Sequence, residues 1–126
     1  MASNLDHVLE FIDAWSRLEL EPILGAMTED CFYHNMPWPP IVGQVAIREA
    51  LAQFMAGAEA IEWQVLHAGE TRDGAVLTER LDRFLINGKW IEIPVMGTFE
   101  LRDGLISRWR DYFDSAQFET AMASLT

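Results

Sequence analysis

The sequence of 126 residues has little cysteine, few basic residues and no long apolar run. Cys31 is the only cysteine, which excludes a disulfide framework and a thiolate metal cluster. Nine Lys and Arg residues against 20 Asp and Glu residues give a formal net charge of -11. This balance argues against nucleic acid and anionic membrane surfaces as partners, because both need basic patches. No apolar stretch is long enough to span a bilayer.

Signals for export and for metal binding are also missing. The N-terminal segment MASNLDHVLEF has no basic region and no long apolar core, so we expect a cytoplasmic protein. His7, His34 and His67 show no ligand spacing, and we expect no metal and no cofactor. Half of the residues are hydrophobic, and the length suits a single domain over 1–126 with its own core.

Helical patterns come first in the chain and strand patterns follow. Helices are expected over 5–18, with Ser3 or Asn4 as the N-cap, over 21–27, opened by Pro22, and over 44–58. A short strand is expected at 31–36, before the loop PWPPIVG. Strands over 60–70, 75–87, 89–101 and 105–114 and a last helix over 115–125 complete the chain. Helices followed by an antiparallel meander indicate an α+β fold.

The register of the central hairpin can be derived from its turn. Asn87-Gly88 is a strong signal for a two-residue loop. Such a loop pairs Ile86 with Lys89, and further along it pairs Asp82 with Ile93 and Arg80 with Val95. Paired residues lie on the same face of a sheet, so we expect Arg80 and Asp82 to lie among apolar side chains.

The next connection leaves two registers open. A two-residue loop at Asp103-Gly104 would place Asp111 beside Met96, on the face opposite Arg80. A three-residue loop that includes Arg102 would place Asp111 beside Val95 instead. We favour the second register, because it places a set of large apolar side chains on the same face as Arg80 and turns a mainly polar set outward. The inward set is Leu105, Trp109 and Phe113, and the outward set is Ile106, Arg108, Arg110 and Tyr112.

Arg80, Asp82 and Asp111, named the trio below, then converge on a face that should be apolar. Buried charges are costly unless they are paired or used in chemistry. The structural alternative is an ion pair that fixes the strand register, but one arginine needs only one carboxylate. A second carboxylate at the same place therefore favours an acid–base site. Tyr33 and Asn35 share a face of the 31–36 strand, and with a carboxylate they could hold one water molecule.

Three segments in matching order resemble the limonene-1,2-epoxide hydrolase family: YHNMPWPPIVG, the Arg-x-Asp of ERLDR, and WRDYFD. The resemblance implies the cone-shaped α+β fold of the nuclear transport factor 2-like superfamily. In that fold a curved, antiparallel or mixed sheet carries the N-terminal helices on its concave face. The family's catalytic Arg and Asp residues fall on Arg80, Asp82 and Asp111, and its water-binding residues fall on Tyr33 and Asn35. The chain is shorter than the family at its N-terminus and in the central hairpin.

The resemblance also implies a reaction. Water adds to a small apolar epoxide in one step, without a covalent enzyme intermediate, and gives a vicinal diol. Asp111 acts as the base, Asp82 as the acid, and Arg80 bridges both. Side chains expected to line the substrate pocket are Met36, Trp38, Phe84, Ile93, Val95, Phe113 and Phe118, whereas Trp15 and Trp63 are expected to pack between helix and sheet.

Two other functional classes stay open, because the same fold serves many activities. One is a proton-transfer enzyme of the ketosteroid isomerase or polyketide cyclase kind. The other is a noncatalytic module that binds an apolar ligand. Whatever the function, we expect a homodimer, because Leu77, Leu81 and Leu85 give the outer sheet face an apolar character that calls for a partner.

Overall fold

A computed structural model describes residues 2–125, so the predicted domain limits at 1 and 126 lie outside the described range. The elements are α1 (Asn4–Ser16), α2 (Leu20–Gly25), β1 (Met27–Asn35), β2 (Ile41–Val42), α3 (Gln44–Ala56), β3 (Ala60–Glu70), β4 (Val76–Ile86), β5 (Lys89–Arg102), β6 (Leu105–Tyr112) and α4 (Ser115–Ala123). No helix within this range is long and apolar enough to cross a membrane.

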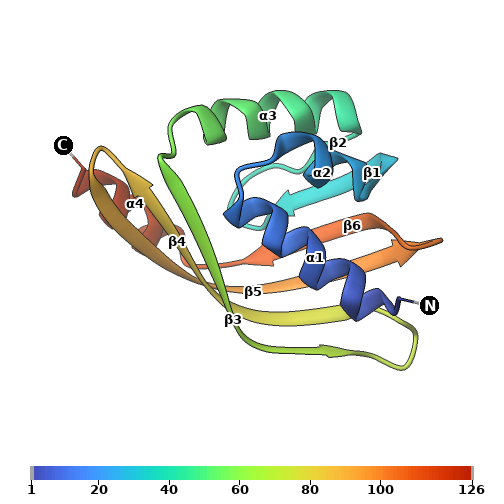
Figure 1. The fold of residues 1–126 in the computed structure, drawn as a ribbon. Helices are drawn as coiled ribbons and strands as arrows, with labels where there is room; N and C mark the ends of the chain where they lie inside the picture. Colours follow the sequence, from blue (N-terminus) through green and yellow to red (C-terminus); the bar gives the residue numbers. More distant parts are fainter. Residues whose placement is uncertain (1, 126) are drawn as a thin grey trace.

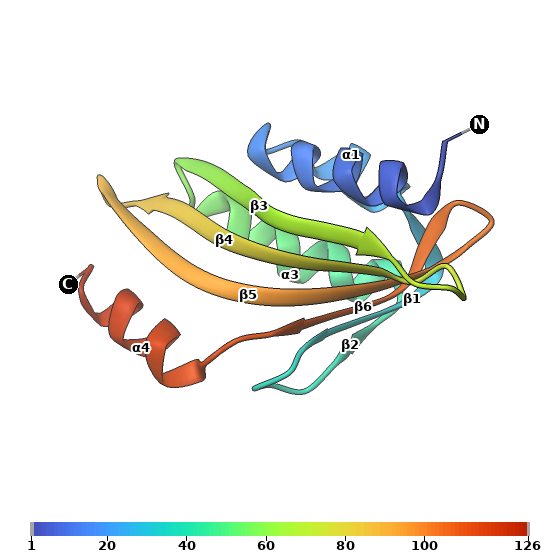
Figure 2. The same ribbon diagram turned by 90° about the horizontal axis from the view of Figure 1, so that it is seen from below.

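The six strands form one curved sheet in the order β2-β1-β6-β5-β4-β3. Strand β1 runs parallel to β6, and the other neighbouring strands are antiparallel. Helices α1, α2 and α3 lie on the concave face, and α4 lies at the end of the sheet near the β4–β5 hairpin (Figures 1 and 2). The predicted α+β fold, with the N-terminal helices on the concave face, is confirmed.

Aromatic side chains fill the space between α1 and the sheet. A capping box between Ser3 and Asp6 starts the helix. Its buried face places Phe11 edge-on against Trp109, with ring centroids 5.1 Å apart. Trp15 stacks on Trp63 at 4.5 Å, as predicted for the helix–sheet interface. This packing holds α1 against the concave face, beside the edge strand β3.

Several predicted boundaries differ from the structure. Helix α2 begins at Leu20, so Pro22 lies in its first turn rather than at its first position; a missing N–H is tolerated there, because the first N–H groups have no intrahelical acceptor. Strand β1 is longer than predicted, and the loop after it contains the short strand β2, which pairs with β1. Helix α3 ends at Ala56, with Gly57 as its C-cap.

The central hairpin has the predicted register. Asn87 and Gly88 both have positive φ, which suits a two-residue turn. Arg80 lies opposite Val95, and Asp82 lies opposite Ile93. The pairing confirms that both charged side chains face the helices together with the apolar side chains of β5.

The β5–β6 register differs from the prediction. The loop is the two-residue Asp103-Gly104 turn, and a β-bulge follows in β6 between the Glu100 and Leu101 pairings. The extra residue shifts the pairing, so Asp111 lies opposite Gly97 rather than Val95. Asp111 still reaches the predicted face, because a bulge reverses which side the following residues point to. Ile106, predicted to point outward, is buried, and Leu105, predicted to point inward, is exposed.

Candidate active site

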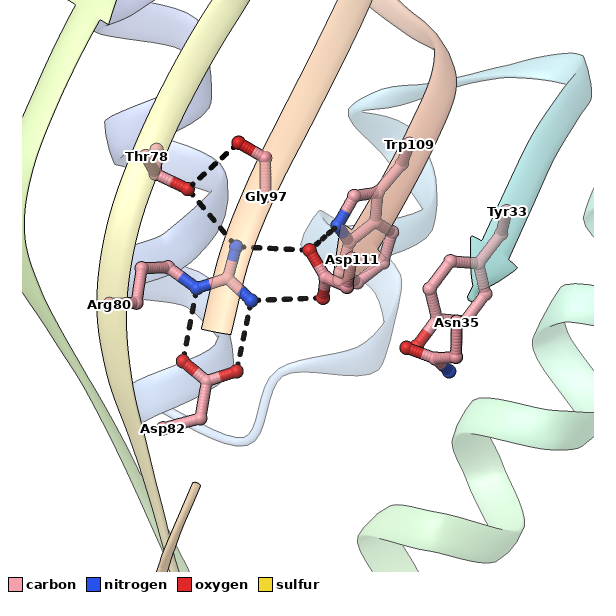
Figure 3. Close-up of polar contacts among 8 residues, drawn as sticks. All are labelled: Tyr33, Asn35, Thr78, Arg80, Asp82, Gly97, Trp109 and Asp111. Atoms are coloured by element: carbon pink, nitrogen blue, oxygen red, sulfur yellow. Dashed lines mark hydrogen bonds and ion pairs between the residues drawn. The ribbon is translucent and has the colours of Figure 1, made fainter. Parts of the chain in front are cut away.

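Arg80 joins the two carboxylates of the trio (Figure 3). Its Nε and Nη2 donate to Asp82 at 3.0 and 2.9 Å, and its Nη1 and Nη2 donate to Asp111 at 3.2 and 2.9 Å. Nη1 also donates to Thr78 Oγ1 at 3.2 Å, so each of the five guanidinium N–H groups has an acceptor. The Arg80 side chain is fully buried, and those of both aspartates are 5% exposed. The structure thus brings the predicted trio together in a nearly dry environment.

The two carboxylates differ in the donors that surround them. Burial raises the pKa of Asp82 to about 6, although the Arg80 guanidinium opposes this shift. Asp111 accepts a third hydrogen bond, from Trp109 Nε1 at 2.8 Å. One arginine with two ionised aspartates would leave a buried negative charge, whereas one proton makes the cluster neutral. The burial of Asp82 therefore favours that carboxyl as the holder of the proton.

Tyr33 and Asn35 reach the same place through the parallel pairing of β1 with β6. Asn35 lies opposite Asp111, and Tyr33 lies opposite Trp109, whose ring it stacks on at 4.1 Å. Asn35 Nδ2 donates to the Tyr33 hydroxyl at 2.9 Å. Burial, together with the negative charge of Asp111, raises the pKa of Tyr33. Tyr33 therefore keeps its proton and can donate it in a hydrogen bond.

A cavity of about 180 Å³ opens beside these groups. Its polar side chains are Tyr33, Asn35, Asp82 and Asp111, whereas Arg80 lies behind the carboxylates and does not line it. The remaining lining is Trp15, Trp38, Ile41, Ala50, Leu51, Phe54, Trp63, Phe84, Ile93, Val95, Phe113 and Phe118. Such a cavity accepts an apolar molecule and offers it a small number of hydrogen-bonding side chains.

Most of the predicted pocket residues lie in this wall, but Met36 does not. Its backbone N–H donates to the Asp111 carbonyl oxygen at 2.9 Å. Met36 lies in the turn that follows β1, and it is 37% exposed. At the cavity, Trp38 contacts Phe113 and Phe118 edge to face, with ring centroids 5.4 and 5.2 Å apart. The rings of Phe113 and Phe118 are tilted against each other at 6.1 Å.

Sequence reasoning missed two groups of residues. The first group, from α1, β2, α3 and β3, closes the cavity and is Trp15, Ile41, Ala50, Leu51, Phe54 and Trp63. The second group supports the trio: Thr78, Gly97, Trp109, and Trp63, whose ring lies 4.5 Å from Arg80 Cζ. The signal available for Trp109 was its position two residues before Asp111 on the same strand face. For the first group no sequence signal fixes which face of a helix meets the cavity.

The other reactive side chains lie elsewhere. Burial raises the pKa of Cys31 to about 12, which makes it a poor nucleophile. Within residues 2–125, no cluster of three or more His, Cys, Asp or Glu residues has an arrangement that could hold a metal ion. His34 Nε2 lies 2.8 Å from the Trp38 carbonyl oxygen, away from Tyr33 and Asn35.

Two comparisons with solved structures agree with this fold. A structure titled as an LEH-like epoxide hydrolase from Mycobacterium tuberculosis superposes with a TM-score of 0.83 at 30% identity, covering 97% of this chain and 91% of that one. A SnoaL-like polyketide cyclase, named as putative, from Shewanella denitrificans superposes with a TM-score of 0.85 at 14% identity, covering 96% and 97% of the two chains. At 14% identity the second likeness concerns the fold alone.

Sequence comparison identifies the family. The curated protein Epoxide hydrolase EphG from Mycobacterium tuberculosis is 34% identical over 105 residues, which are 82% of this chain and 68% of that protein. The family model described as the limonene-1,2-epoxide hydrolase catalytic domain matches residues 2–123. Together with Asp82 and Asp111 in the wall of an apolar cavity, these matches show that the chain belongs to the limonene-1,2-epoxide hydrolase family of epoxide hydrolases.

Proposed function

We propose that this epoxide hydrolase adds water to a small apolar epoxide in one general acid–base step and releases a vicinal diol. One observation carries the proposal: Asp82 and Asp111 share Arg80 and both line the same apolar cavity. Asp111 is the base and Asp82 is the acid, in line with the pKa of Asp82 being raised by burial. Arg80 holds both carboxylates in place without contacting the substrate.

Tyr33 and Asn35 orient the attacking water. Asn35 occupies one acceptor position of the Tyr33 hydroxyl, which leaves the Tyr33 proton and Asn35 Oδ1 for the water molecule. One O–H of the water donates a hydrogen bond to Asn35 Oδ1. The other proton is transferred to Asp111 as the water oxygen attacks an epoxide carbon. The carbon–oxygen bond of the ring breaks as the epoxide oxygen takes the proton of Asp82. Exchange with solvent then returns the proton from Asp111 to Asp82.

The test is hydrolysis of a cyclic epoxide in heavy-oxygen water. We expect diol that carries one solvent oxygen, with chiral separation reporting the preferred enantiomer. A panel of terpene, cyclohexene and cyclopentene oxides would define the size of substrate accepted. Isomerised ketone instead of diol would support the proton-transfer alternative, and binding without turnover would support the apolar-ligand module. Either result would refute the proposal.

We further propose that the outer sheet face forms a homodimer. Leu77 is 45% exposed and Met96 is 52% exposed on that face, and Leu81 and Leu85 are half-buried. Light scattering at micromolar concentration should give twice the chain mass, and Leu81→Lys should give the single mass with unchanged helix content. A monomeric parent protein would contradict this. The single-domain organisation and a cytoplasmic location also remain predictions.

A further inference from the structure

Gly97 occupies the tightest position next to the trio. It is buried in β5, opposite Thr78 of β4 on one side and Asp111 of β6 on the other. A Cβ atom built on Gly97 would overlap Arg80 Nη1, and it would lie 2.6 Å from Asp111 Oδ1 and 3.1 Å from Thr78 Oγ1. Real Cβ atoms essentially never lie closer than 3.0 Å to another heavy atom. A side chain at this position therefore cannot coexist with the observed contact between Arg80 and Asp111.

The strand order explains why the space is needed. Arg80 and Asp111 belong to strands separated by β5, and each step between strands is about 4.8 Å. The guanidinium has to pass over β5 to reach Asp111, and Figure 3 shows it lying across that strand beside Gly97. Thr78 Oγ1 accepts from Arg80 Nη1 at 3.2 Å and lies 3.3 Å from the Gly97 carbonyl oxygen, to which it donates. Where the Arg80 guanidinium crosses β5, it is therefore bordered by Thr78, Gly97 and Asp111.

Backbone conformation does not require a glycine at this position. Gly97 lies in a strand and, unlike Gly74, Gly88 and Gly104, does not have positive φ. Any residue can adopt such a backbone, and glycine within a strand is itself unfavourable. Position 97 therefore requires glycine because it has no side chain, and not because of its backbone conformation.

We propose that Gly97 is a positioning residue, whose lack of a side chain opens the slot through which Arg80 reaches Asp111 and so holds the base beside the acid. The proposal deepens the function proposed above, and its kinetic consequences rest on it. The structural claim, a steric conflict between a side chain at position 97 and the guanidinium, is independent of any substrate.

The kinetic test compares Gly97→Ala with Gly69→Ala. Gly69 also lies in a strand, and a Cβ there meets nothing within 4 Å, so it is a matched control. We expect Gly97→Ala to lose about 10²-fold in kcat/KM for a cyclic epoxide, because a displacement of about 1 Å can cost that much. Gly69→Ala should stay within about twofold of the parent. Parental activity in folded Gly97→Ala would overturn the proposal.

A second readout separates positioning from a general loss of structure. Trp109 Nε1 donates to Asp111, so its indole N–H resonance in a nitrogen-15 spectrum reports protonation of the trio. The other titratable groups facing Asp111 are Arg80 and Asp82 on β4 and Tyr33 on β1. When Arg80 is displaced, the pH midpoint of this resonance should rise by at least about one unit. A parental midpoint in Gly97→Ala would overturn the proposal.

The third test is a thermal-unfolding cycle with Arg80→Lys, whose shorter head group lacks the Nη1 atom that conflicts with the Cβ. The fall in Tm caused by Gly97→Ala should be less than half as large in the Arg80→Lys background. If Gly97→Ala folds only in that background, the proposal is supported. An equal fall in both backgrounds, or no folding in either, would overturn it. If the parent hydrolyses no epoxide, the proposed function fails, while this cycle and the indole titration still decide the role of Gly97.

Discussion

Strand β4 carries an arginine cluster on each of its faces, and both clusters contain the same functional groups: a guanidinium, two carboxylates and an indole ring. On the concave face Arg80 donates to Asp82 and Asp111, and its Cζ lies 4.5 Å from the ring centre of Trp63. On the outer face Arg83 donates to Glu62 at 3.1 Å and to Glu92 at 2.9 Å. Its Cζ lies 4.5 Å from the ring centre of Trp90. Each arginine therefore joins two carboxylates and lies on a tryptophan.

Burial separates the two clusters. The Arg83 side chain is 23% exposed and its carboxylate partners are about half exposed, whereas the side chains of the trio are nearly inaccessible. Hydrogen bonds from Gln64 and Arg83 lower the pKa of Glu62, while burial raises that of Asp82. The same ionic contacts thus give a charged surface network on one face and a proton-holding cluster on the other. Because both clusters contain the same functional groups, their solvation decides whether a surface network or a proton-holding cluster forms.

The two clusters should differ most in how substitutions within them affect catalysis. Asp82→Asn and Asp111→Asn keep the size of the side chain but remove the acid and the base. Each should lower epoxide hydrolysis by about 10²–10⁴-fold, measured as diol formation. The double variant should be hardly worse than either single variant, because groups acting in one step are not additive. Glu62→Gln and Glu92→Gln, in the outer cluster, are the controls and should retain parental turnover. Near-parental turnover in either folded Asn variant would refute the mechanism.

Removing Arg80 should lower the free energy of unfolding more than removing Arg83 does. Arg80→Met leaves two buried carboxylates without a cation, and we expect a loss of about 3–5 kcal/mol in the free energy of unfolding. Arg83→Met removes partly exposed pairs and should cost about 0–1 kcal/mol. Urea unfolding at neutral pH measures both. Equal losses would mean that burial does not distinguish the clusters. Arg80→Lys should also lose activity, because lysine lacks the planar fork that spans two carboxylates.

The pH dependence of activity should follow Asp82. Its pKa is raised from 3.8 to about 6, and the reaction needs its proton, so kcat/KM should fall as pH rises through about 6. The midpoint belongs to the coupled trio. The residual activity of Asp82→Asn should not show this fall in kcat/KM, whereas Glu62→Gln should still show it. A parental profile that is flat between pH 5 and 8 would contradict the assignment of the acid.

Stability should respond to pH with opposite signs on the two faces. The raised pKa of Asp82 means that its contribution is fully present below pH 3.8 and is lost as pH rises through about 6. The lowered pKa of Glu62 means that its contribution is present above 4.5 and is lost as pH falls. The Tm difference between parent and Asp82→Asn should therefore vary with pH in the opposite direction to the difference between parent and Glu62→Gln. The same direction for both would contradict the comparison.

The smallest expected difference concerns the tryptophans beneath the arginines. Cation–π contacts contribute about 2 kcal/mol when desolvated and about 0.5–1 kcal/mol when exposed. Trp63 is 8% exposed and Trp90 is 39% exposed. Trp63→Leu should therefore lower the free energy of unfolding by more than Trp90→Leu does. Trp63→Leu should also raise KM, because Trp63 lines the cavity. An equal effect of both changes on unfolding, or an unchanged KM in Trp63→Leu, would contradict the comparison.

The sequence by itself determined the pairing of Arg80 with Asp82 and the register of the β4–β5 hairpin. Both follow from local rules, because side chains alternate along a strand and a two-residue Asn-Gly turn sets the pairing of its flanks. The resemblance of three segments to one family then gave the roles proposed for Asp111, Tyr33 and Asn35. The predicted face of Asp111 was correct although its predicted partner was wrong.

Only the tertiary structure decided the partner of Asp111, the position of Asn35 and the residues of the cavity wall. The bulge in β6 replaced Val95 by Gly97 as the partner of Asp111, and a bulge has no clear signal in a single sequence. The parallel pairing of β1 with β6 brought Asn35 beside Asp111 across 76 positions of the chain. The cavity wall from α1, α3 and β3 depended on how the helices dock. These features are contacts between distant segments, and their energies depend on burial that local patterns do not specify.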